Sequence, residues 1–207
     1  MRDRLRASLG TLVAQLFFIA AGVYLGNRAD DWKQEREHRQ AARATLENFR
    51  TEVRRNRAQV AGMRPYHAAM RDSLRVILKE GGPRPMDALT NRFRYGKNTE
   101  FTGLGGVEFS TAAWELALAS QALAYVNPRI AFRIAEAYTQ QRTFAGIQSA
   151  FMQPLFAPST HAEGTQKPVA YALGAYLGDA TYQEATLLGK YDALLPGLDS
   201  AIARTAK

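Results

Sequence analysis

Residues 9–26, LGTLVAQLFFIAAGVYLG, constrain this chain more than any other segment, because eighteen consecutive positions carry no charge. As a helix the segment is about 27 Å long at about 1.5 Å per residue, close to the thickness of a bilayer's hydrocarbon core. Two other interpretations compete: a cleaved signal peptide, which needs a clear small-x-small site, and a buried core helix. We predict an uncleaved anchor, with a basic tail over 1–8 and a transmembrane helix over 9–26.

The flanks of this segment supply a predicted membrane interface. Aromatic rings and the long stems of arginine favour this boundary, because their apolar parts lie in lipid while their polar ends reach water. Lys and Arg are nearly balanced on the two sides, but a short arginine tail stays in the cytoplasm more easily than a large domain. We expect a bacterial inner-membrane protein with a periplasmic or otherwise extracytoplasmic C-terminal domain. The interface residues are Arg4, Arg6, Tyr24, Arg28 and Trp32.

A charged stalk helix is predicted over 27–64, where alanine, arginine, glutamate and glutamine dominate and proline is absent. Within it, apolar positions recur at spacings of four and three from Ala42 to Met63, and Asn56 is the one polar member. A GxxxG pair at the end of the span also permits close helix approach, although small residues are common in spans. Whether the seam packs within one chain or between copies stays open. The candidate association residues are Gly22, Gly26, Leu46, Phe49, Val53, Asn56 and Val60.

A line of arginines seven residues apart runs beside this seam. Residues 1–64 hold 13 of the 27 Lys and Arg but only 7 of the 19 Asp and Glu, so the basic charge is concentrated there. The line is either a solvated flank, or a surface that meets lipid phosphates near the membrane and an acidic partner further out. This candidate basic edge consists of Arg36, Arg43, Arg50, Arg57 and Arg64.

The remainder, residues 65–207, is predicted to be a helical bundle domain. Pro65 is expected to interrupt the stalk helix, and Gly81-Gly82-Pro83 to end the helix that follows. No stretch alternates like a strand, so the fold class is all-α. The expected helices are Tyr66–Leu78, 86–93, 112–126 after a cap by Ser110 or Thr111, a long helix from Asn127-Pro128 to Phe151, Val169–Leu177, and Thr181–Ile202 with a kink at Pro196, separated by loops over 95–110 and 157–167.

Two stretches resemble a known family: AAGVYLGNRADDWKQERE, and TAAWELALASQALAYVNPRIAFRIAEAYTQQ. Together they are similar to an uncharacterised family of bacterial single-span membrane-anchored helical proteins. The resemblance covers about half of the chain and consists mainly of hydrophobic patterns. This sequence departs from the pattern in having Arg-Ala-Asp-Asp between Asn27 and Trp32, and Ser120-Gln121-Ala122 where a glycine often occurs. The resemblance implies a membrane-anchored helical protein and no catalytic residues.

Motifs for catalysis are missing from the sequence. Cysteine is absent, and His38, His67 and His161 are not at metal-ligand spacing. The GLGG sequence at 103–106 lacks the Lys-Ser/Thr of a P-loop. The basic charge lies beside an apolar segment, and no nucleic-acid-binding motif accompanies it. We therefore predict no enzyme activity, no cofactor, no metal and no nucleic-acid partner.

Residues 114–151 are rich in aromatic side chains, which either pack in the core or line a small apolar pocket between helices. The candidate pocket residues are Trp114, Glu115, Arg133 and Tyr138. The predicted function is a membrane-anchored module for contacts with another envelope protein or a second copy, in addition to the lipid bilayer. The alternative is a membrane-tethered sensory or small-ligand-binding domain, whose ligand the sequence does not identify.

Overall fold

The computed structural model describes residues 2–95, 103–155 and 164–205, with side chains given except for residues 2–20, 94 and 95. Within these ranges the chain is all-helical, which confirms the predicted fold class. The elements are α1 (Arg2–Glu80), α2 (Pro85–Tyr95), α3 (Ala112–Ala119), the 3-10 helix η1 (Ala122–Tyr125), α4 (Pro128–Leu155) and α5 (Gln166–Thr205).

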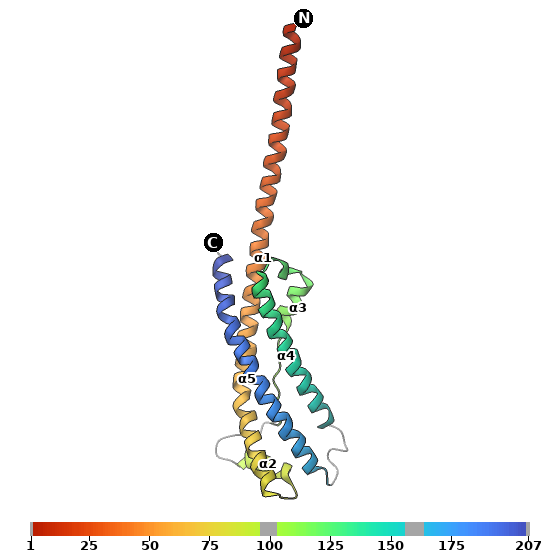
Figure 1. Ribbon diagram of the computed structural model, residues 1–207, viewed down its shortest axis with the longest axis vertical. Helices are drawn as coiled ribbons and strands as arrows, with labels where there is room; N and C mark the ends of the chain where they lie inside the picture. The colour runs from red at the N-terminus through yellow and green to blue at the C-terminus, as the bar shows by residue number, and fades with distance from the viewer. Residues whose placement is uncertain (1, 96–102, 156–163, 206–207) are drawn as a thin grey trace.

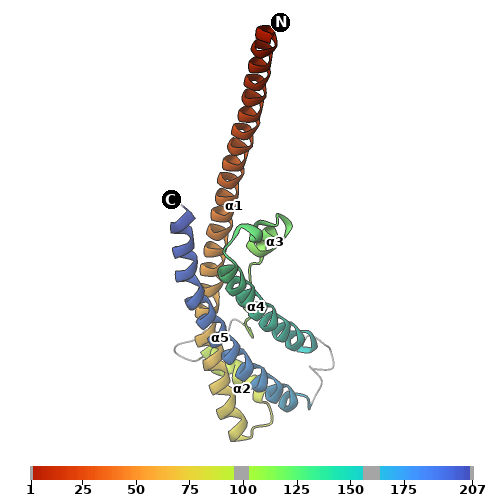
Figure 2. The same cartoon turned by 45° about the horizontal axis from the view of Figure 1, so that its top comes forward.

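The C-terminal half of α1 forms a bundle with α4 and α5, while its N-terminal half projects from the bundle as a single helix (Figure 1). α5 runs antiparallel to α1, and the chain's C-terminus lies beside the middle of α1 (Figures 1 and 2). α2 packs at the end of the bundle that is remote from the N-terminus, and α3 with η1 packs at the other end. The bundle begins near His38, whose ring stacks on Tyr125 of η1 at 4.1 Å between centroids.

α1 and α5 pack along their length because the buried residues of each helix are alternately four and three positions apart. This spacing keeps the buried residues on one face of the helix. Along α1 the pattern continues well past Met63, and α5 has the same pattern. On α1 the repeat comprises Ala42, Leu46, Phe49, Val53, Asn56, Val60, Met63, His67, Met70, Leu74 and Ile77, and on α5 Leu173, Leu177, Ala180, Glu184, Leu187, Tyr191, Leu194 and Leu198, all buried except the partly buried Met63.

Residues 103–111, here called the strap, lie between α1 and α4 without regular secondary structure. Tyr66 on α1 donates a 2.5 Å hydrogen bond to the carbonyl of Gly103. Gln148 on α4 binds both backbone groups of Val107, accepting from its N–H at 2.9 Å and donating to its carbonyl at 3.3 Å. The strap therefore receives from side chains the hydrogen bonds that a strand would receive from a neighbouring strand.

The predicted interruption at Pro65 is wrong, because α1 passes through this residue without a break. Proline removes one backbone hydrogen bond from a helix interior. Pro65 lies on the exposed face, however, while Val60 before it and Met70 after it are both fully buried in the same core. Packing on both sides outweighs the lost hydrogen bond, so the predicted boundary between stalk and body at residue 65 does not coincide with the end of a helix.

The C-terminal helices also differ from their predicted bounds. The two predicted segments after residue 168 form one helix, α5, in which Ala180 and Thr181 are buried and Pro196 lies inside. The predicted helix over 112–126 is divided instead, because Gln121 has a φ of 55° and separates α3 from η1. Residues 96–102 and 157–163 of the two predicted loops lie outside the described residues.

Helix ends follow local chemistry at most of the predicted positions. Gly81, with a φ of 76°, ends α1, and its N–H binds the carbonyl of Ile77 at 3.2 Å. Asn127 caps α4, because its Oδ1 accepts the N–H of Arg129 at 3.0 Å and Pro128 follows at the first helical position. These two predictions are confirmed. Thr111 makes no capping hydrogen bond with its side chain, and an acceptor from α1 takes that role at α3.

Candidate functional site

A cluster of buried polar side chains holds the strap at Ser110. The Nδ2 of Asn56 donates to the carbonyl of Ser110 at 2.8 Å, and its Oδ1 accepts the Ser110 N–H at 3.0 Å. Gln141 on α4 donates a second hydrogen bond to the same carbonyl at 3.3 Å and accepts one from Asn56 at 3.1 Å. Tyr191 on α5 donates to Gln141 at 2.7 Å. Asn56 therefore binds the strap and α4 within its own chain.

Glu52 lies one turn earlier on α1, and its buried carboxylate receives three hydrogen bonds. The donors are the Tyr138 hydroxyl at 2.5 Å, the Ser110 hydroxyl at 2.7 Å and the Ala113 N–H at 2.9 Å. The last of these is one of the free backbone donors at the start of α3, so Glu52 caps α3 from another helix. Burial, and then the hydrogen bond to Glu52, raise the pKa of Tyr138 far above its ordinary value. The cluster thus holds a neutral phenol against a carboxylate.

A second polar pair, His67 on α1 and Glu184 on α5, is completely buried. The Nδ1 of His67 lies 2.5 Å from Oε1 of Glu184. Their other polar atoms, Nε2 of His67 and Oε2 of Glu184, are buried and have no hydrogen-bond partner in the described part of the chain, and the same is true of the Tyr176 hydroxyl. Burial, and then the charge of Glu184, raise the pKa of Tyr176 to about 12. Unpaired buried polar atoms are rare in folded proteins, so this pair is a candidate site.

The candidate association residues of the seam lie inside the bundle. Leu46, Phe49, Val53, Asn56 and Val60 are at most 2 % exposed, against α4, α5 and the strap. In this structure the seam is therefore filled within one chain. Gly22 and Gly26 lie on the projecting part of α1, where, apart from adjacent residues and the backbone of α1 itself, no described atom lies within 4 Å of the position that a Cβ would take.

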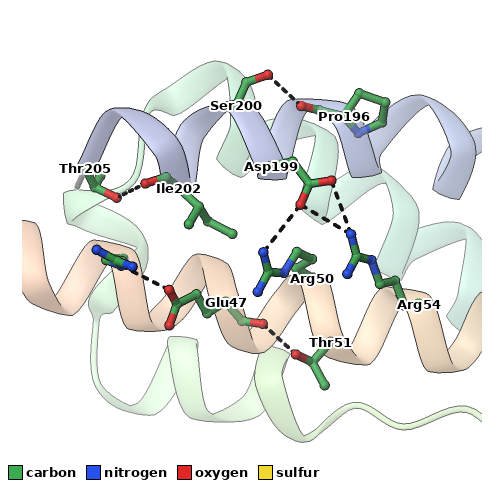
Figure 3. A network of polar contacts seen from close by, with 10 residues as sticks. Glu47, Arg50, Thr51, Arg54, Pro196, Asp199, Ser200, Ile202 and Thr205 are labelled. Carbon is green, nitrogen blue, oxygen red and sulfur yellow. Dashed lines mark hydrogen bonds and ion pairs between the residues drawn. The ribbon is translucent and has the colours of Figure 1, made fainter. Parts of the chain in front are cut away.

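The candidate basic edge meets acidic residues of the chain's own α5. Asp199 pairs with Arg50 at 3.5 Å and with Arg54 at 3.3 Å (Figure 3). Asp192, seven residues earlier, pairs with Arg57 at 2.5 Å. Hydrogen bonding to Asp192 and its charge raise the pKa of Arg57. Exposed pairs of this kind contribute about 0.2–1 kcal/mol each, so they fix the register of α1 on α5 more than they stabilise it.

The other arginines of the edge have different surroundings. Arg43 pairs with Glu47 at 3.0 Å within α1, and Arg64 is exposed. Arg36 lies over the ring of Trp32, 5.9 Å from its centroid. The five residues therefore do not form one continuous free surface.

The described members of the predicted membrane interface form a row on the projecting helix. Tyr24, Arg28 and Trp32 are four residues apart, and Arg36 of the basic edge continues the row. Arg28 lies 5.9 Å from the centroid of Tyr24. Tyr24 and Trp32 are both 61 % exposed. Two more interface residues, Arg4 and Arg6, have side chains outside the described set.

The four candidate pocket residues are dispersed. The rings of Trp114 and Tyr138 stack in the core with centroids 5.2 Å apart. Glu115 is exposed and accepts the Thr111 hydroxyl at 2.7 Å, and Arg133 donates to the carbonyl of Ala193 at 2.7 Å. None of the four lines the cavities of about 380 Å³ beside the strap or about 390 Å³ between α1 and α5. The described residues contain no group of three or more His, Cys, Asp or Glu that would hold a metal ion.

Sequence reasoning left out Glu52, His67, Gln141 and Glu184 as site residues. Two of them had a recognisable signal. Extending the repeat of α1 past Pro65 places His67 in the seam, and the repeat of α5 places Glu184 between Ala180 and Leu187. A charged or titratable residue at a buried position of such a repeat is expensive unless it is paired. Nothing comparable distinguishes Glu52 or Gln141 in the sequence.

Comparison of the chain with protein families, with curated proteins and with solved structures finds no match. Among the residues searched, namely those that the structure describes, no helix is long and apolar enough to cross a membrane. The predicted span has no support from those residues, and the side chains of residues 9–20 lie outside them.

Proposed function

We propose that this chain is a membrane-anchored interaction module, in which residues 9–26 lie in the bilayer and the helical bundle is held away from it. The observation that carries the proposal is the continuity of α1, which runs from the apolar segment into the core of the bundle as one helix. A single helix without tertiary partners is marginal in water, because most helical stability in proteins comes from packing. Lipid around the apolar segment supplies that environment.

The end of the apolar segment supports this placement. Val23, Tyr24 and Leu25 are 60–66 % exposed, although they are large and apolar. The row from Tyr24 to Arg36 alternates aromatic rings with arginines, a composition typical of a lipid–water boundary. Tyr24 and Trp32 are about 12 Å apart along the axis, more than one headgroup layer of about 5–8 Å, so the two rings can lie on its inner and outer sides. The first fully packed residue, Ala42, lies about 24 Å beyond Gly26, so a gap separates the bundle from the hydrocarbon core.

The proposed class is the one that the sequence resembles, that of bacterial single-span membrane-anchored helical proteins. In the proposal the bundle faces the periplasm or another extracytoplasmic space and binds an envelope protein or a second copy. Because the seam is filled within the chain, the proposed contact between copies involves Gly22 and Gly26 in the span and not the seam.

Membrane fractionation with carbonate extraction, followed by the intact mass of the extracted protein, tests the anchor. Wild type is expected to stay in the membrane with residues 1–26 attached. Ala14→Arg with Phe18→Arg should release it, because charge at the bilayer centre costs about 2.5–3.5 kcal/mol per residue. The matched control places arginine at the exposed positions Val76 and Tyr182 of the bundle and should not release it. A soluble wild type, or one that begins near residue 27, would refute the anchor.

Cysteine chemistry tests orientation and self-association, because the native chain has no cysteine. Ala185→Cys, at an exposed position of α5, should react with an impermeant maleimide added outside the inner membrane. Ala29→Cys, just beyond the span, should cross-link between copies, and Gly22→Leu with Gly26→Leu should abolish the cross-link. Gly62→Leu is the control, because it is an equally open glycine on α1 within the bundle. Labelling only from the cytoplasmic side would overturn the orientation, and a cross-link insensitive to Gly22 and Gly26 would overturn the contact.

A further inference from the structure

His67 has a buried nitrogen whose hydrogen-bonding capacity is unused. Its side chain is 0 % exposed, and Nδ1 is engaged by the carboxylate of Glu184. A carboxylate accepts hydrogen bonds, so Nδ1 is the donor in this contact, and in the tautomer that this selects for a neutral ring Nε2 carries the lone pair. Nε2 has no hydrogen-bond partner among the described residues. The contact with Glu184 therefore orients the ring and directs its second nitrogen into the interior.

The space that Nε2 faces is shared with the sulfur of Met63. A Cβ added to Gly105 of the strap would lie 3.4 Å from Nε2 of His67 and 3.0 Å from Sδ of Met63. The nitrogen and the sulfur are therefore at most 6.4 Å apart, the sum of those two distances. Met63 and His67 are four residues apart on α1 and lie on the same face. Nε2 projects from the side of the ring opposite Nδ1, so Glu184 cannot approach the same point.

Glycine lets the strap backbone pack directly on these side chains. Gly105 has a φ of +67°, which other residues rarely adopt, and an added Cβ would lie 3.0 Å from Sδ of Met63 and 3.4 Å from Nε2 of His67. Tyr66 holds Gly103 through its hydroxyl, and its ring edge lies 3.4 Å from the same added Cβ. The backbone at Gly105 thus covers the point that the nitrogen and the sulfur both face, and no Cβ stands between them.

We infer that Met63 and His67 form a binding site for a soft monovalent metal ion of the Cu(I) class. Thioether sulfur selects soft ions, and imidazole is a good ligand for copper, whereas the hard cations prefer oxygen. A carboxylate on the other ring nitrogen is the usual outer-shell partner of a metal-binding histidine, and Glu184 occupies that position. Buried water fits less well, because it needs two to four polar partners, and here Nε2 faces a thioether, which accepts hydrogen bonds only weakly.

Binding requires a small adjustment of one side chain. With the bond lengths of zinc to nitrogen and to sulfur as a guide, about 2.0 and 2.3 Å, the two ligands of a linear site lie about 4.3 Å apart. Met63 is only partly buried and has three rotatable side-chain bonds, so its sulfur can move toward His67 while the ring stays fixed by Glu184. The site is independent of the membrane anchor, and it would give the bundle a metal-sensing or metal-carrying role beyond the proposed anchoring.

Silver(I), a redox-inert stand-in for Cu(I), provides the test on the purified full-length protein. The methyl groups of methionine are followed by NMR with carbon-13 label, and Met63→Leu identifies the signal of Met63. Upon addition of one equivalent of Ag(I), the Met63 signal is expected to shift fully before that of any other methionine. The affinity for Ag(I) should fall at least tenfold in Met63→Leu, whereas Met152→Leu, at a half-buried methionine of α4, should bind as wild type.

Two further variants separate binding from folding. Gly105→Ala places a methyl group 3.0–3.4 Å from both ligand atoms and should abolish the Met63 shift while helical circular dichroism is retained. Glu184→Gln should weaken binding without abolishing it, because it removes the negative charge behind the ring. Zn(II) at the same concentration should leave the Met63 signal in place. The site is refuted if no methionine signal moves, if another moves first, or if Met63→Leu binds Ag(I) as tightly as Met152→Leu.

Discussion

Replacing Asn56 with leucine distinguishes a seam that is filled within the chain from a seam that joins two chains. Leucine completes the apolar repeat on α1, so in a coiled coil between copies it removes a costly polar position and raises stability. In this structure Asn56 is 0 % exposed and holds the strap through hydrogen bonds to both backbone groups of Ser110. We therefore expect Asn56→Leu to lower the stability of the bundle.

The size of the loss follows from the groups left behind. The Ser110 carbonyl keeps Gln141, and the Oε1 of Gln141 keeps Tyr191, but the Ser110 N–H has no other partner among the described residues. One unpaired buried donor costs about 1–3 kcal/mol, and each further lost hydrogen bond about 1 kcal/mol. Burying the leucine recovers part of this, which leaves a loss of about 3 kcal/mol in the free energy of unfolding. For a body of this size the melting temperature should fall by about 6–12 °C.

Thermal unfolding of full-length protein, followed by far-ultraviolet circular dichroism at several protein concentrations, measures the effect. The matched control is Asn48→Leu, which makes the same chemical change at an exposed position two turns earlier on α1 and should shift the melting temperature little. Hydrogen exchange should also show faster exchange in the strap of Asn56→Leu. An Asn56→Leu variant that melts at or above the wild-type temperature would refute the assignment of Asn56 to the strap.

Three further outcomes are expected. Glu52→Gln should destabilise the bundle by about 2–4 kcal/mol, because a carboxylate that accepts three hydrogen bonds is replaced by an amide. Hydrogen exchange at the Ala113 amide should also become faster. Unchanged exchange at Ala113 would contradict the capping role of Glu52. The pKa of Tyr176 is raised to about 12, so the folded state keeps a proton that the unfolded state loses near pH 10. The contribution of Tyr176 to stability should therefore be constant below about pH 10 and be lost as the pH rises toward 12. Tyr176→Phe should reduce that slope in denaturant melts, and an identical slope would argue against it. Asp199→Asn should cost less than about 1 kcal/mol by urea unfolding although it pairs with two arginines, because the pairs are exposed; a loss above 2 kcal/mol would show that these pairs do more than set register.

The all-α class could be predicted because helical periodicity is a local signal. The repeat on α1, the cap at Asn127 and the glycine end at Gly81 each depend on residues within two turns of one another. The prediction failed where packing outweighs a local preference. Pro65 disfavours helix continuation, but the buried positions on both sides of it hold α1 together. The same competition joined the two predicted segments of α5 into one helix.

Local sequence thus determined that this chain forms helices, that α1 ends at Gly81 and α4 begins after Asn127, and that an apolar segment precedes a charged one. Which polar residues meet was decided by the tertiary structure alone. Asn56 and Ser110 are 54 residues apart in the sequence, and His67 and Glu184 are 117 apart. A single residue in a helical repeat has the same local pattern whether it faces lipid, another copy or its own chain. Only the packing of α1 against α5 and the strap gives each of these side chains its partner, because hydrogen bonds and ion pairs act over a few ångströms and not along the chain.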